Sequence, residues 1–483
     1  MREKKKILLL GDDLTLPSGI GVMSKEIVLG TIDKFDWVQL GGAMKHPKEG
    51  QILDLSDAVS NEFGIDDAYL KIYCTSGYGN PLILRQLINL ENPDAILHFT
   101  DPRFWEWLYQ MEREIRQDIP IFYYTIWDDL PDPQWNDKFY ASCDSLYCIS
   151  KQTYGIVNRV LDKGYGDELA IENEMEIQPT SDRRRVNIKY IPHGINTDTY
   201  HPIKKGDKDW DMMQNMKKSI FGENEPEYVL FYNSRNIRRK MTSDVIVAFK
   251  DFLMDIDEED RNDCYLVLHT TPVDDNGTDL PAVIEAIIPE EYRKNVILSG
   301  EKVEANQLNC LYNIADTTIL ISSNEGFGLG TAESLAAGTP IIVNVTGGLQ
   351  DQCGFKLDGE YLTADDYLEI GSLHRWREWE NNDRLSHGDW VKPVWSKAVN
   401  LVGSPPTPYI YDDRVDVKDV TEAIKYWYYM DSENRKKCGK RGLRWLKNEG
   451  GLNSENMTEL FKKNMIEDLE NFKPRKRFEV VKL

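Results

Sequence analysis

The stretch SSNEGFGLGTAESLAAGTP, residues 322–340, follows the apolar, β-rich run TTILIS at 317–322. That run is typical of a strand buried on both faces of a parallel sheet. Glycines then open a loop, and Thr331 is placed to cap a helix that runs to Ala337, where Gly338 ends it. The sequence therefore predicts a helix that begins where a buried strand ends, with a glycine-rich loop between them.

Two glutamates lie on this segment, Glu325 on the loop and Glu333 in the first helical turn. In doubly wound sheets, ligands bind at the carboxyl ends of the strands, and the free N–H groups of a helix start favour phosphate oxygens. Carboxylates accept hydrogen bonds from hydroxyls, which ribose and hexose carry in pairs. The pair therefore favours a sugar-nucleotide site. The alternative is that Glu333 complements the helix dipole and that Glu325 is a solvated loop residue.

The composition indicates a globular protein of two or three domains, with 483 residues of which 41% are hydrophobic. The longest apolar runs are far shorter than the about 20 residues that span a bilayer, and we expect neither a signal peptide nor a transmembrane segment. Seven scattered cysteines without a Cys-x-x-Cys pair indicate free thiols and no structural zinc. We therefore expect a cytoplasmic protein, whose oligomeric state the sequence leaves open.

The net charge of −23 disfavours non-specific binding to nucleic acid or anionic membranes, which need excess positive surface. Two basic clusters remain, RKKCGKRGLRWLK at 435–447 and KPRKR at 473–477. They could meet an anionic acceptor, or they could form a solvated helix face and a tail. Charge alone does not identify the acceptor.

Short apolar runs alternate with amphipathic stretches, the pattern of strands and crossover helices in a parallel sheet. A first series predicts strands at 6–11, 37–40, 70–74, 95–99, 121–126, 145–149 and 187–191. A second series predicts a strand from Tyr228 and strands at 265–269, 295–299, 317–322 and 341–345, with helices at 243–255 and 305–315. We therefore expect an α/β protein with two doubly wound, Rossmann-like domains that face a central cleft.

Composition also suggests the domain boundaries. Residues 1–200 form the first domain, and 201–226, rich in Pro, Gly, Lys and Asp, form a connector. Residues 227–450 form the second domain, and 451–483 form a C-terminal helix and basic tail that could cross back to the first. The stretch 355–408 breaks the alternation and predicts a long irregular segment. Its aromatic residues could stack on an acceptor, or the segment could be a lid packed on its own domain.

Arg235 and Lys240 follow the first strand of the second series. A donor diphosphate needs cations to offset its charge and the charge that develops on the leaving group. These two residues are therefore the predicted phosphate ligands, whereas Arg238 and Arg239 could be solvated.

Gly19 and Gly21 in PSGIG open a helix predicted at 20–31. A dinucleotide-binding fold would also begin with such glycines. However, Ser24 stands at the third glycine position, and the strand that follows ends in Gly41 and Gly42 without the acidic residue that would bind a ribose. A nicotinamide oxidoreductase is therefore the weaker interpretation.

Five segments together resemble the retaining nucleotide-sugar glycosyltransferases of family four, which have the two-domain GT-B fold. The two glutamates match the spacing of the family's Glu-x7-Glu motif, and the sequence EGFGL at its start matches as well. The other segments are KKILLLGDDLTLPSGIG (5–21), IPHGINTDTYHP (191–202), FYNSRNIRRK (231–240) and NVILSGEK (295–302). GDDLTLPSGIG and its continuation, SKEIVLGTIDKFDWVQLGG, also resemble glycosyltransferases of large tailed phages, some of whose relatives glycosylate hydroxymethylated bases in DNA.

The resemblance implies transfer of a sugar from a nucleoside diphosphate sugar to an acceptor hydroxyl, with retention of configuration. It implies that Glu325 holds sugar hydroxyls, that Glu333 holds the ribose, and that no nucleophilic side chain is needed. The first domain is then the acceptor side, the second binds the donor, and 355–408 is an insertion. The predicted donor-binding residues are Gly19, Gly21, Arg235, Lys240, Gly326, Phe327, Gly328, Leu329, Thr331 and Glu333.

One position departs from the family. In IFYYTIWDDLPDP (121–133), Trp127 stands where the family usually carries a histidine. Asp128 is then the nearest candidate to orient the sugar or the acceptor, with His98 and Trp127 as acceptor-side candidates. Asp128 and His98 could instead be satisfied structural groups, as we expect for His193. The predicted catalytic residues are Glu325, Arg235, Lys240 and Asp128.

We expect neither a cofactor nor a catalytic metal. No Asp-x-Asp flanked by apolar strand residues occurs in the sequence, and cationic side chains and helix dipoles can take a metal's place. The acceptor stays open between a glycan, a lipid, a protein and a hydroxymethylated base in DNA. Two other classes remain as alternatives: a phosphorylase of the same fold, which would need a lysine for pyridoxal phosphate, and a non-catalytic sugar-nucleotide-binding protein.

Overall fold

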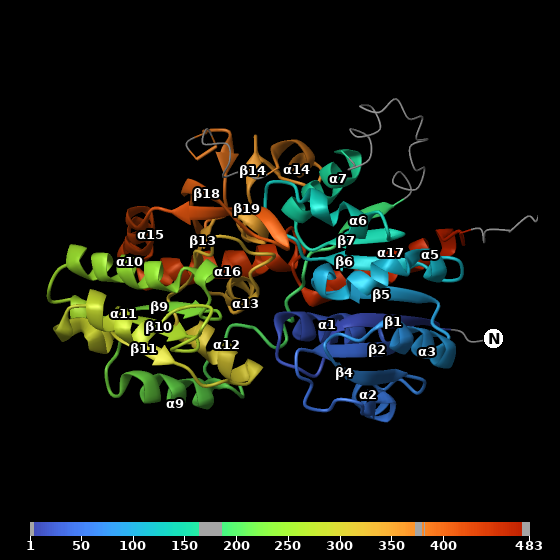
Figure 1. The fold of residues 1–483 in the computed structure, drawn as a ribbon. Coiled ribbons are helices and arrows are strands. Elements are labelled where there is room, and N and C mark those ends of the chain that lie inside the picture. Colours follow the sequence, from blue (N-terminus) through green and yellow to red (C-terminus); the bar gives the residue numbers. More distant parts are fainter. Residues whose placement is uncertain (1–3, 164–185, 372–378, 381, 476–483) are drawn as a thin grey trace, which may run out of the picture. The chain divides into compact units, whose positions relative to one another are not determined.

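The structure, a computed structural model, describes residues 4–163, 186–371, 379–380 and 382–475. The chain divides into two compact units, which Figure 1 shows as ribbons. Unit 1 consists of Met1–Gly194, Ser404–Pro408 and Ser454–Leu483, and unit 2 of Ile195–Gly403 and Tyr409–Asn453. The chain therefore leaves unit 1, builds unit 2, and returns to unit 1 with its last helix.

Unit 1 is built on an eight-stranded sheet with the order β3-β4-β2-β1-β5-β6-β7-β8. All neighbouring strands are parallel except β3, which is antiparallel to β4. The apolar residues 7–10 of β1 are at most 1% exposed, because β1 is central and covered on both faces. The strands are β1 (Lys5–Asp12), β2 (Phe35–Ala43), β3 (Ile52–Asp54), β4 (Leu70–Ser76), β5 (Ala95–Phe99), β6 (Ile121–Thr125), β7 (Ser145–Cys148) and β8 (Asn187–Tyr190).

The helices of unit 1 connect these strands, as expected for parallel pairing. The helix α1 (Gly19–Thr31) begins at Gly19 because Ser18 caps it, accepting a hydrogen bond from the Gly21 N–H at 2.9 Å. The other helices are α2 (Ser56–Phe63), α3 (Pro81–Glu91), α4 (Glu106–Gln110), α5 (Glu112–Ile115), α6 (Asp137–Tyr140), α7 (Lys151–Lys163) and α17 (Ser454–Asn471), with the 3-10 turns η1 (Pro102–Trp105) and η2 (Gln134–Asn136). In the part of the chain that the structure describes, none of the helices is long and apolar enough to cross a membrane.

The C-terminal helix α17 is an integral part of unit 1. It packs on α1, where Gly30 leaves the space that the Thr458 side chain occupies. Asp468 of α17 accepts a hydrogen bond from the Tyr147 hydroxyl at 2.8 Å, and both groups are buried. The last helix therefore completes a unit that the first residues of the chain begin.

Unit 2 is built on a six-stranded, fully parallel sheet with the order β11-β10-β9-β12-β13-β17. Its strands are β9 (Tyr228–Asn233), β10 (Cys264–His269), β11 (Val296–Ser299), β12 (Thr317–Leu320), β13 (Ile341–Asn344) and β17 (Val391–Val394). Its helices are α9 (Trp210–Phe221), α10 (Thr242–Asp255), α11 (Leu280–Ile287), α12 (Ala305–Ile314), α13 (Leu329–Ala336), α14 (Asp366–Ile370), α15 (Val417–Tyr429) and α16 (Ser432–Lys447), with the 3-10 turns η4 (Arg238–Lys240), η5 (Arg261–Asp263), η6 (Glu290–Asn295) and η7 (Gly347–Gln352).

Helices cover both faces of this sheet, as the side chains of β9 illustrate. Leu230 points to the face covered by α10 and α15, whereas its neighbours Val229 and Phe231 point to the face covered by α9 and α12. Figure 1 shows α10 and α9 on opposite sides of β9. Because successive side chains of a strand point to opposite faces, a strand covered on both sides must be apolar throughout. The prediction of an α/β fold with two doubly wound units is confirmed.

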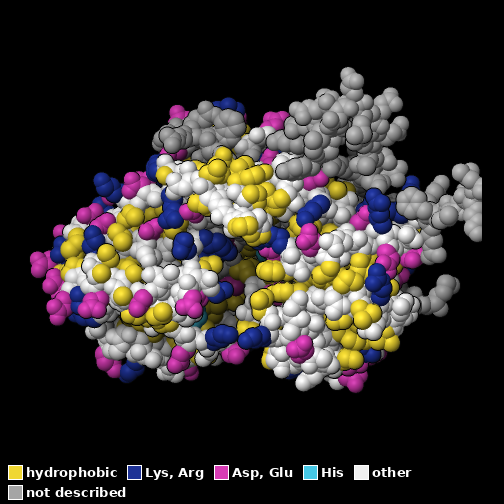
Figure 2. Space-filling view, viewed as in Figure 1, with side chains coloured by type: hydrophobic (Ala, Val, Ile, Leu, Met, Phe, Trp, Pro, Cys, Tyr) yellow, Lys and Arg dark blue, Asp and Glu magenta, His cyan; other side chains and the backbone are white. Residues whose placement is uncertain are grey.

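Two predicted segments differ from expectation. The connector 201–226 contains α9, which packs on α12 and is part of unit 2. The stretch 355–408 is not irregular where the structure describes it: it provides β17, a small sheet of β14 (Lys356–Leu357), β15 (Glu360–Tyr361) and β16 (Leu385–Ser386), and most of the hairpin β18 (Ser396–Ser404) and β19 (Thr407–Val415). Residues 372–378 and 381 of this stretch lie outside the described residues. Figure 2 shows hydrophobic side chains exposed over the hairpin, in which Leu401 is 64% exposed.

Candidate functional site

The glycine-rich loop joins β12 to α13, and β12 lies between β9 and β13 in the sheet. The helix begins at Leu329 because Gly328, its N-cap residue, adopts a left-handed backbone with φ of 87°. The prediction that Thr331 caps the helix is therefore wrong. Thr331 lies in the first turn, and its hydroxyl donates to the Gly328 carbonyl oxygen at 3.0 Å.

Two further glycines, which the sequence did not single out, hold this loop in place. The Gly348 N–H donates to the Glu325 carbonyl oxygen at 2.8 Å. A Cβ atom on Gly347 would overlap the backbone of Glu325, and one on Gly348 would overlap the backbone of Gly326. The loop after β12 and the turn η7 after β13 therefore approach each other more closely than any side chain would permit.

Phe327 and Leu329, both predicted to bind the donor, direct their side chains into the core of unit 2. Phe327 is 3% exposed, and its carbonyl oxygen accepts a hydrogen bond from the Gln352 amide at 2.7 Å. Phe327 can therefore meet a ligand only through its backbone, whereas Leu329 is partly exposed.

Glu325 is buried in a cluster of positive charge. Its carboxylate forms an ion pair with Lys240 and lies 3.3 Å from the Arg239 guanidinium. Burial alone would raise the pKa of Glu325, but the charges of Lys240 and Arg239 and the hydrogen bonds to the carboxylate outweigh it, so the pKa is lowered. The structure thus brings Glu325 and Lys240 together. Arg239 is exposed, as its expected solvation implies, but its guanidinium also donates to the Asn324 carbonyl oxygen at 2.5 Å.

Glu333 lies in a different environment, although it is equally buried. The Tyr312 hydroxyl donates to its carboxylate at 2.7 Å, and the Asn233 amide donates to the same hydroxyl at 2.7 Å. Burial raises the pKa of Glu333, and hydrogen bonds from Tyr312 and Tyr200 offset this rise only in part. Sequence patterns gave no signal for Tyr312, which lies in a segment without a motif; Tyr200 lies in the motif segment 191–202 but was not singled out there.

Arg235 lies apart from this cluster. It pairs with Asp274 at 3.2 Å, and its side chain is 62% exposed. The turn η4 (Arg238–Lys240) follows, and Asn236 anchors the loop before it through a hydrogen bond from its amide to the Thr278 carbonyl oxygen at 2.7 Å. The loop after β9 therefore presents one exposed cation and one buried cation.

In unit 1, Gly19 and Gly21 lie at the start of α1. A Cβ on Gly21 would come within 2.5 Å of the Leu16 carbonyl oxygen and 2.8 Å of the Asp13 carbonyl oxygen. Gly21 is therefore required for the tight packing of the β1–α1 loop. Gly19 is exposed at the first position of the helix, and its role in donor binding stays a prediction.

Trp127 and Asp128 lie on the loop after β6. The Trp127 indole donates to the Asp129 carbonyl oxygen at 2.8 Å, and the Gln152 amide donates to the Asp128 carbonyl oxygen at 2.5 Å. The Arg103 guanidinium lies over the Trp127 ring, 5.7 Å from its centroid. This loop is held by the start of α7, and the roles of Trp127 and Asp128 stay predictions.

His98 is part of the core of unit 1, which overturns its assignment to the acceptor side. It is fully buried, its Nδ1 lies 2.6 Å from the Tyr109 hydroxyl, and its ring stacks on Tyr123 at 4.9 Å. Burial lowers the pKa of His98 to about 3, so the ring is neutral at pH 7. His193 is also buried, with its Nδ1 2.7 Å from the Tyr124 hydroxyl. Both histidines serve the packing of unit 1.

Asp13, His46 and Cys74 bring three possible metal ligands together in the interior of unit 1. The Lys48 N–H donates to Nδ1 of His46 at 3.0 Å, so Nδ1 carries no proton. In the neutral ring Nε2 then carries it and donates to the Asp13 carboxylate at 2.9 Å. This tautomer leaves no lone pair of Nε2 for a metal ion. The three residues form a hydrogen-bonded cluster that fixes the β1–α1 loop.

Residues 213–363 match the family model described as glycosyl transferases group 1. An uncharacterized glycosyltransferase of Methanocaldococcus jannaschii is 22% identical over 312 residues, which cover 60% of this chain and 75% of the relative. A solved glycosyltransferase from Rickettsia africae has a TM-score of 0.60 at 15% identity, covering 97% of this chain and 100% of its own. The structure of Anabaena HepE in complex with UDP and glucose has a TM-score of 0.60 at 11% identity, covering 96% and 100%. These solved structures share the fold over nearly the whole chain.

Replacing Lys240 by Ala should lower the free energy of unfolding by about 3 kcal/mol, because it leaves the buried Glu325 carboxylate with only the partly exposed Arg239 as a counter-charge. Arg235→Ala is the matched control on the same loop, and the loss of its exposed pair should cost about 1 kcal/mol or less. Urea unfolding of both variants measures the difference. Equal losses in the two would contradict the buried ion pair.

The raised pKa of Glu333 predicts a pH-dependent loss of stability. Its folded pKa lies above the ordinary value of 4.5, so the folded state binds the proton more tightly than the unfolded state. This stabilising contribution is complete below pH 4.5 and is lost as pH rises through the folded pKa. Glu333→Gln should remove this dependence and be relatively more stable than wild type at neutral pH. Denaturant unfolding at several pH values measures this dependence, and the exposed Glu285→Gln is the control. If the free energy of unfolding of wild type and Glu333→Gln changed with pH in parallel, the prediction would be refuted.

Proposed function

We propose that this protein, which is a glycosyltransferase with the GT-B fold, transfers a sugar from a nucleoside diphosphate sugar to an acceptor hydroxyl with retention of configuration. The observation that carries the proposal is the cluster of Lys240, Arg239 and Glu325 at the carboxyl end of β12, next to the start of α13. Such an arrangement combines cations and helix N–H groups for a diphosphate with a carboxylate for sugar hydroxyls. We place the enzyme in family four on the strength of the Glu-x7-Glu spacing.

The donor should lie along this edge of the sheet. Glu325 is charged because its pKa is lowered, so it is a strong acceptor for the hydroxyls of the transferred sugar. Glu333 should accept the ribose hydroxyls, while Tyr312 fixes the orientation of its carboxylate. HepE, which shares the fold, was solved with UDP and glucose, and this supports a nucleotide sugar as the donor here.

In the proposed reaction, the bond between the anomeric carbon and the diphosphate oxygen breaks and a bond from the acceptor oxygen to that carbon forms on the same face. The acceptor proton passes to the leaving oxygen of the diphosphate, so the two products are a glycoside and a nucleoside diphosphate. Lys240 and Arg235, with the N–H groups at the start of α13, would stabilise the charge that develops on the diphosphate. No covalent intermediate on a side chain is required.

Ion pairs neutralise part of the two basic clusters. In α16, Arg435 is buried and pairs with Asp316 at 2.9 Å, and Arg441 pairs with Asp389 at 2.5 Å. In the second cluster, Arg475 pairs with Glu112 at 3.0 Å, while residues 476 and 477 lie outside the described residues. Because these three cations are already paired and the net charge of the chain is −23, we place a glycan, lipid or protein acceptor ahead of a hydroxymethylated base.

We further propose that the enzyme works in a reducing, cytoplasmic compartment. All seven cysteines are free and buried. Burial raises the pKa of the Cys74 thiol to about 11, a condition that suppresses its oxidation at neutral pH.

Assaying transfer from a panel of labelled nucleotide sugars, with UDP-glucose first, tests the activity. The anomeric configuration of the product, read from its proton coupling by NMR, should match that of the donor. An inverted product would refute the retaining mechanism but leave the donor assignment standing.

Replacing Glu333 by Ala should weaken UDP binding by about 1–3 kcal/mol, because the ribose hydroxyls lose their buried acceptor. Calorimetry with UDP and with 2′,3′-dideoxy-UDP makes the test specific. Wild type should discriminate strongly between the two ligands, and Glu333→Ala should not. The same discrimination in both proteins would exclude Glu333 as the ribose ligand, and Glu285→Gln should behave as wild type.

The proposed mechanism uses cationic side chains in place of a divalent metal. We therefore expect the transfer rate to be the same with and without EDTA, after dialysis that removes bound metal. A rate that falls with EDTA and returns on addition of Mg²⁺ or Mn²⁺ would show that a metal takes part.

A further inference from the structure

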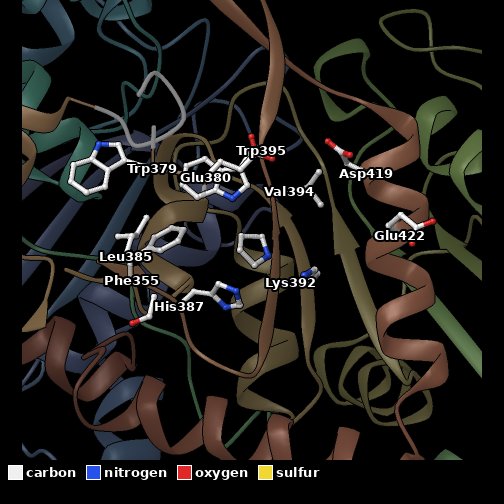
Figure 3. Close-up of a pocket in the computed structure, with 12 residues that line it drawn as sticks. Phe355, Trp379, Glu380, Leu385, His387, Lys392, Val394, Trp395, Asp419 and Glu422 are labelled. Atoms are coloured by element: carbon white, nitrogen blue, oxygen red, sulfur yellow. The ribbon is translucent and has the colours of Figure 1, made fainter. Parts of the chain in front are cut away.

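A cavity of about 300 Å³ lies in unit 2 beside β17, the edge strand of the sheet (Figure 3). One side is formed by β17 and α15, and the other by Phe355, Trp379, Glu380 and Leu385–His387. None of Glu325, Glu333 and Lys240 lines it. Its volume is at the lower end of the range for small-molecule sites, enough for about one or two sugar rings.

Aromatic side chains form much of its apolar surface. Phe355 and Trp395 meet with ring centroids 5.9 Å apart, and Trp379 and Leu385 add further apolar area. Both tryptophans are only partly buried and pack against the core of unit 2, so their rings are held in place while part of each stays accessible. Among the described residues, neither indole N–H has a hydrogen-bond partner. Such rings offer a flat apolar surface with a polar edge.

Polar groups around these rings can bind hydroxyls. The Nδ1–H of His387 donates to the Gly388 carbonyl oxygen at 2.7 Å, so Nε2 of the neutral ring is an acceptor. The Ser386 hydroxyl has no hydrogen-bond partner among the described residues. In Figure 3 the carboxylates of Asp419 and Glu422, both from α15, lie on the opposite side of the view from Trp379. The cavity thus combines a stacking surface with donors and acceptors around its rim.

The charges of the cavity exclude other ligand classes. Three carboxylates, Glu380, Asp419 and Glu422, line it against one lysine, Lys392, so a phosphate or a nucleotide is disfavoured. A cationic ligand is disfavoured too, because Lys397 already forms ion pairs with Glu380 and, at 3.4 Å, with Asp419. What remains is an uncharged molecule that has one apolar face and several hydroxyls.

We infer that this cavity binds a neutral saccharide, and that it holds the part of an acceptor or product glycan remote from the reacting hydroxyl. The first half of the inference stands independently, and the second half rests on the proposed function.

The position of the cavity supports its assignment to the acceptor. The strands β17 and β12 flank β13, so they lie about 10 Å apart. At their carboxyl ends the Ser396 hydroxyl donates to the Asn344 side-chain oxygen at 3.0 Å, and the Asn344 amide donates to the Ser322 carbonyl oxygen at 2.9 Å. This chain of hydrogen bonds joins the end of β17 to the segment that carries Glu325. A short glycan could span the distance between them.

Calorimetric titration with maltose, cellobiose and lactose, alongside UDP and choline, tests the saccharide site. We expect saturable binding of at least one disaccharide at millimolar concentration. Trp379→Ala should weaken it about tenfold or more, since one well-placed aromatic contact is worth about that factor. Glu422→Gln should weaken it less. UDP affinity should be unchanged in both variants, which also shows that they fold, and Glu285→Gln is the matched surface control.

Three results would overturn the inference: no saturable binding of any of the three disaccharides, binding that Trp379→Ala and Glu422→Gln leave unchanged, or displacement of the disaccharide by choline or UDP. The acceptor role is judged separately, by transfer to the disaccharide that binds best. Trp379→Ala should raise the acceptor KM about tenfold and leave the donor KM unchanged. Unchanged acceptor KM would remove the acceptor role and keep the saccharide site, whereas the absence of any donor turnover would instead count against the proposed function.

Discussion

The ion pair between Lys240 and Glu325 is the interaction on which the site depends. Two opposite charges that are both about nine-tenths buried are tolerated only when they face each other, because either one alone would carry a large desolvation penalty. The pair therefore fixes the loop after β9 against the loop after β12, its neighbour in the sheet. Arg239 adds a second cation and a hydrogen bond to the Asn324 backbone. A charged carboxylate can then remain at the carboxyl edge of an otherwise apolar, parallel sheet.

The two glutamates of the motif are equally buried, yet their environments differ in kind. Glu325 faces two cations, and its pKa is lowered; Glu333 faces hydroxyl donors alone, and its pKa is raised. One carboxylate is thus kept as an anion while the other lies closer to neutrality. The two carboxylates are only eight positions apart in sequence. Their pKa values nevertheless shift in opposite directions, because different side chains reach them from β9, α12 and the neighbouring loops.

The strands and the location of the site could be predicted from sequence because both follow from local patterns. Residues 95–99 were predicted as a strand with the bounds that β5 has, since a short apolar run between polar segments has few other possibilities. Contacts between side chains that are distant in sequence could not be predicted. Arg239 rather than Arg235 reaches Glu325, and His98 points into the core although it lies near the end of a strand.

The helix start at Leu329 was missed because a left-handed glycine occupies the capping position, where the sequence suggested a threonine. In the stretch 355–408, β17 was missed because its sequence, VKPV, contains a lysine and a proline, which only an edge strand tolerates.

The return of α17 to unit 1 has a consequence for biosynthesis. Its Thr458 fills the space beside Gly30, and its Asp468 satisfies the hydroxyl of Tyr147, so unit 1 stays incomplete until α17, Ser454–Asn471, has been translated. During translation the surface of α1 that α17 later covers is exposed to solvent, while the whole of unit 2 is being made and can fold. A ribosome that stalls or terminates before the codon for Ser454 would release a chain whose second unit is complete and whose first unit is a natural target for chaperones and proteases.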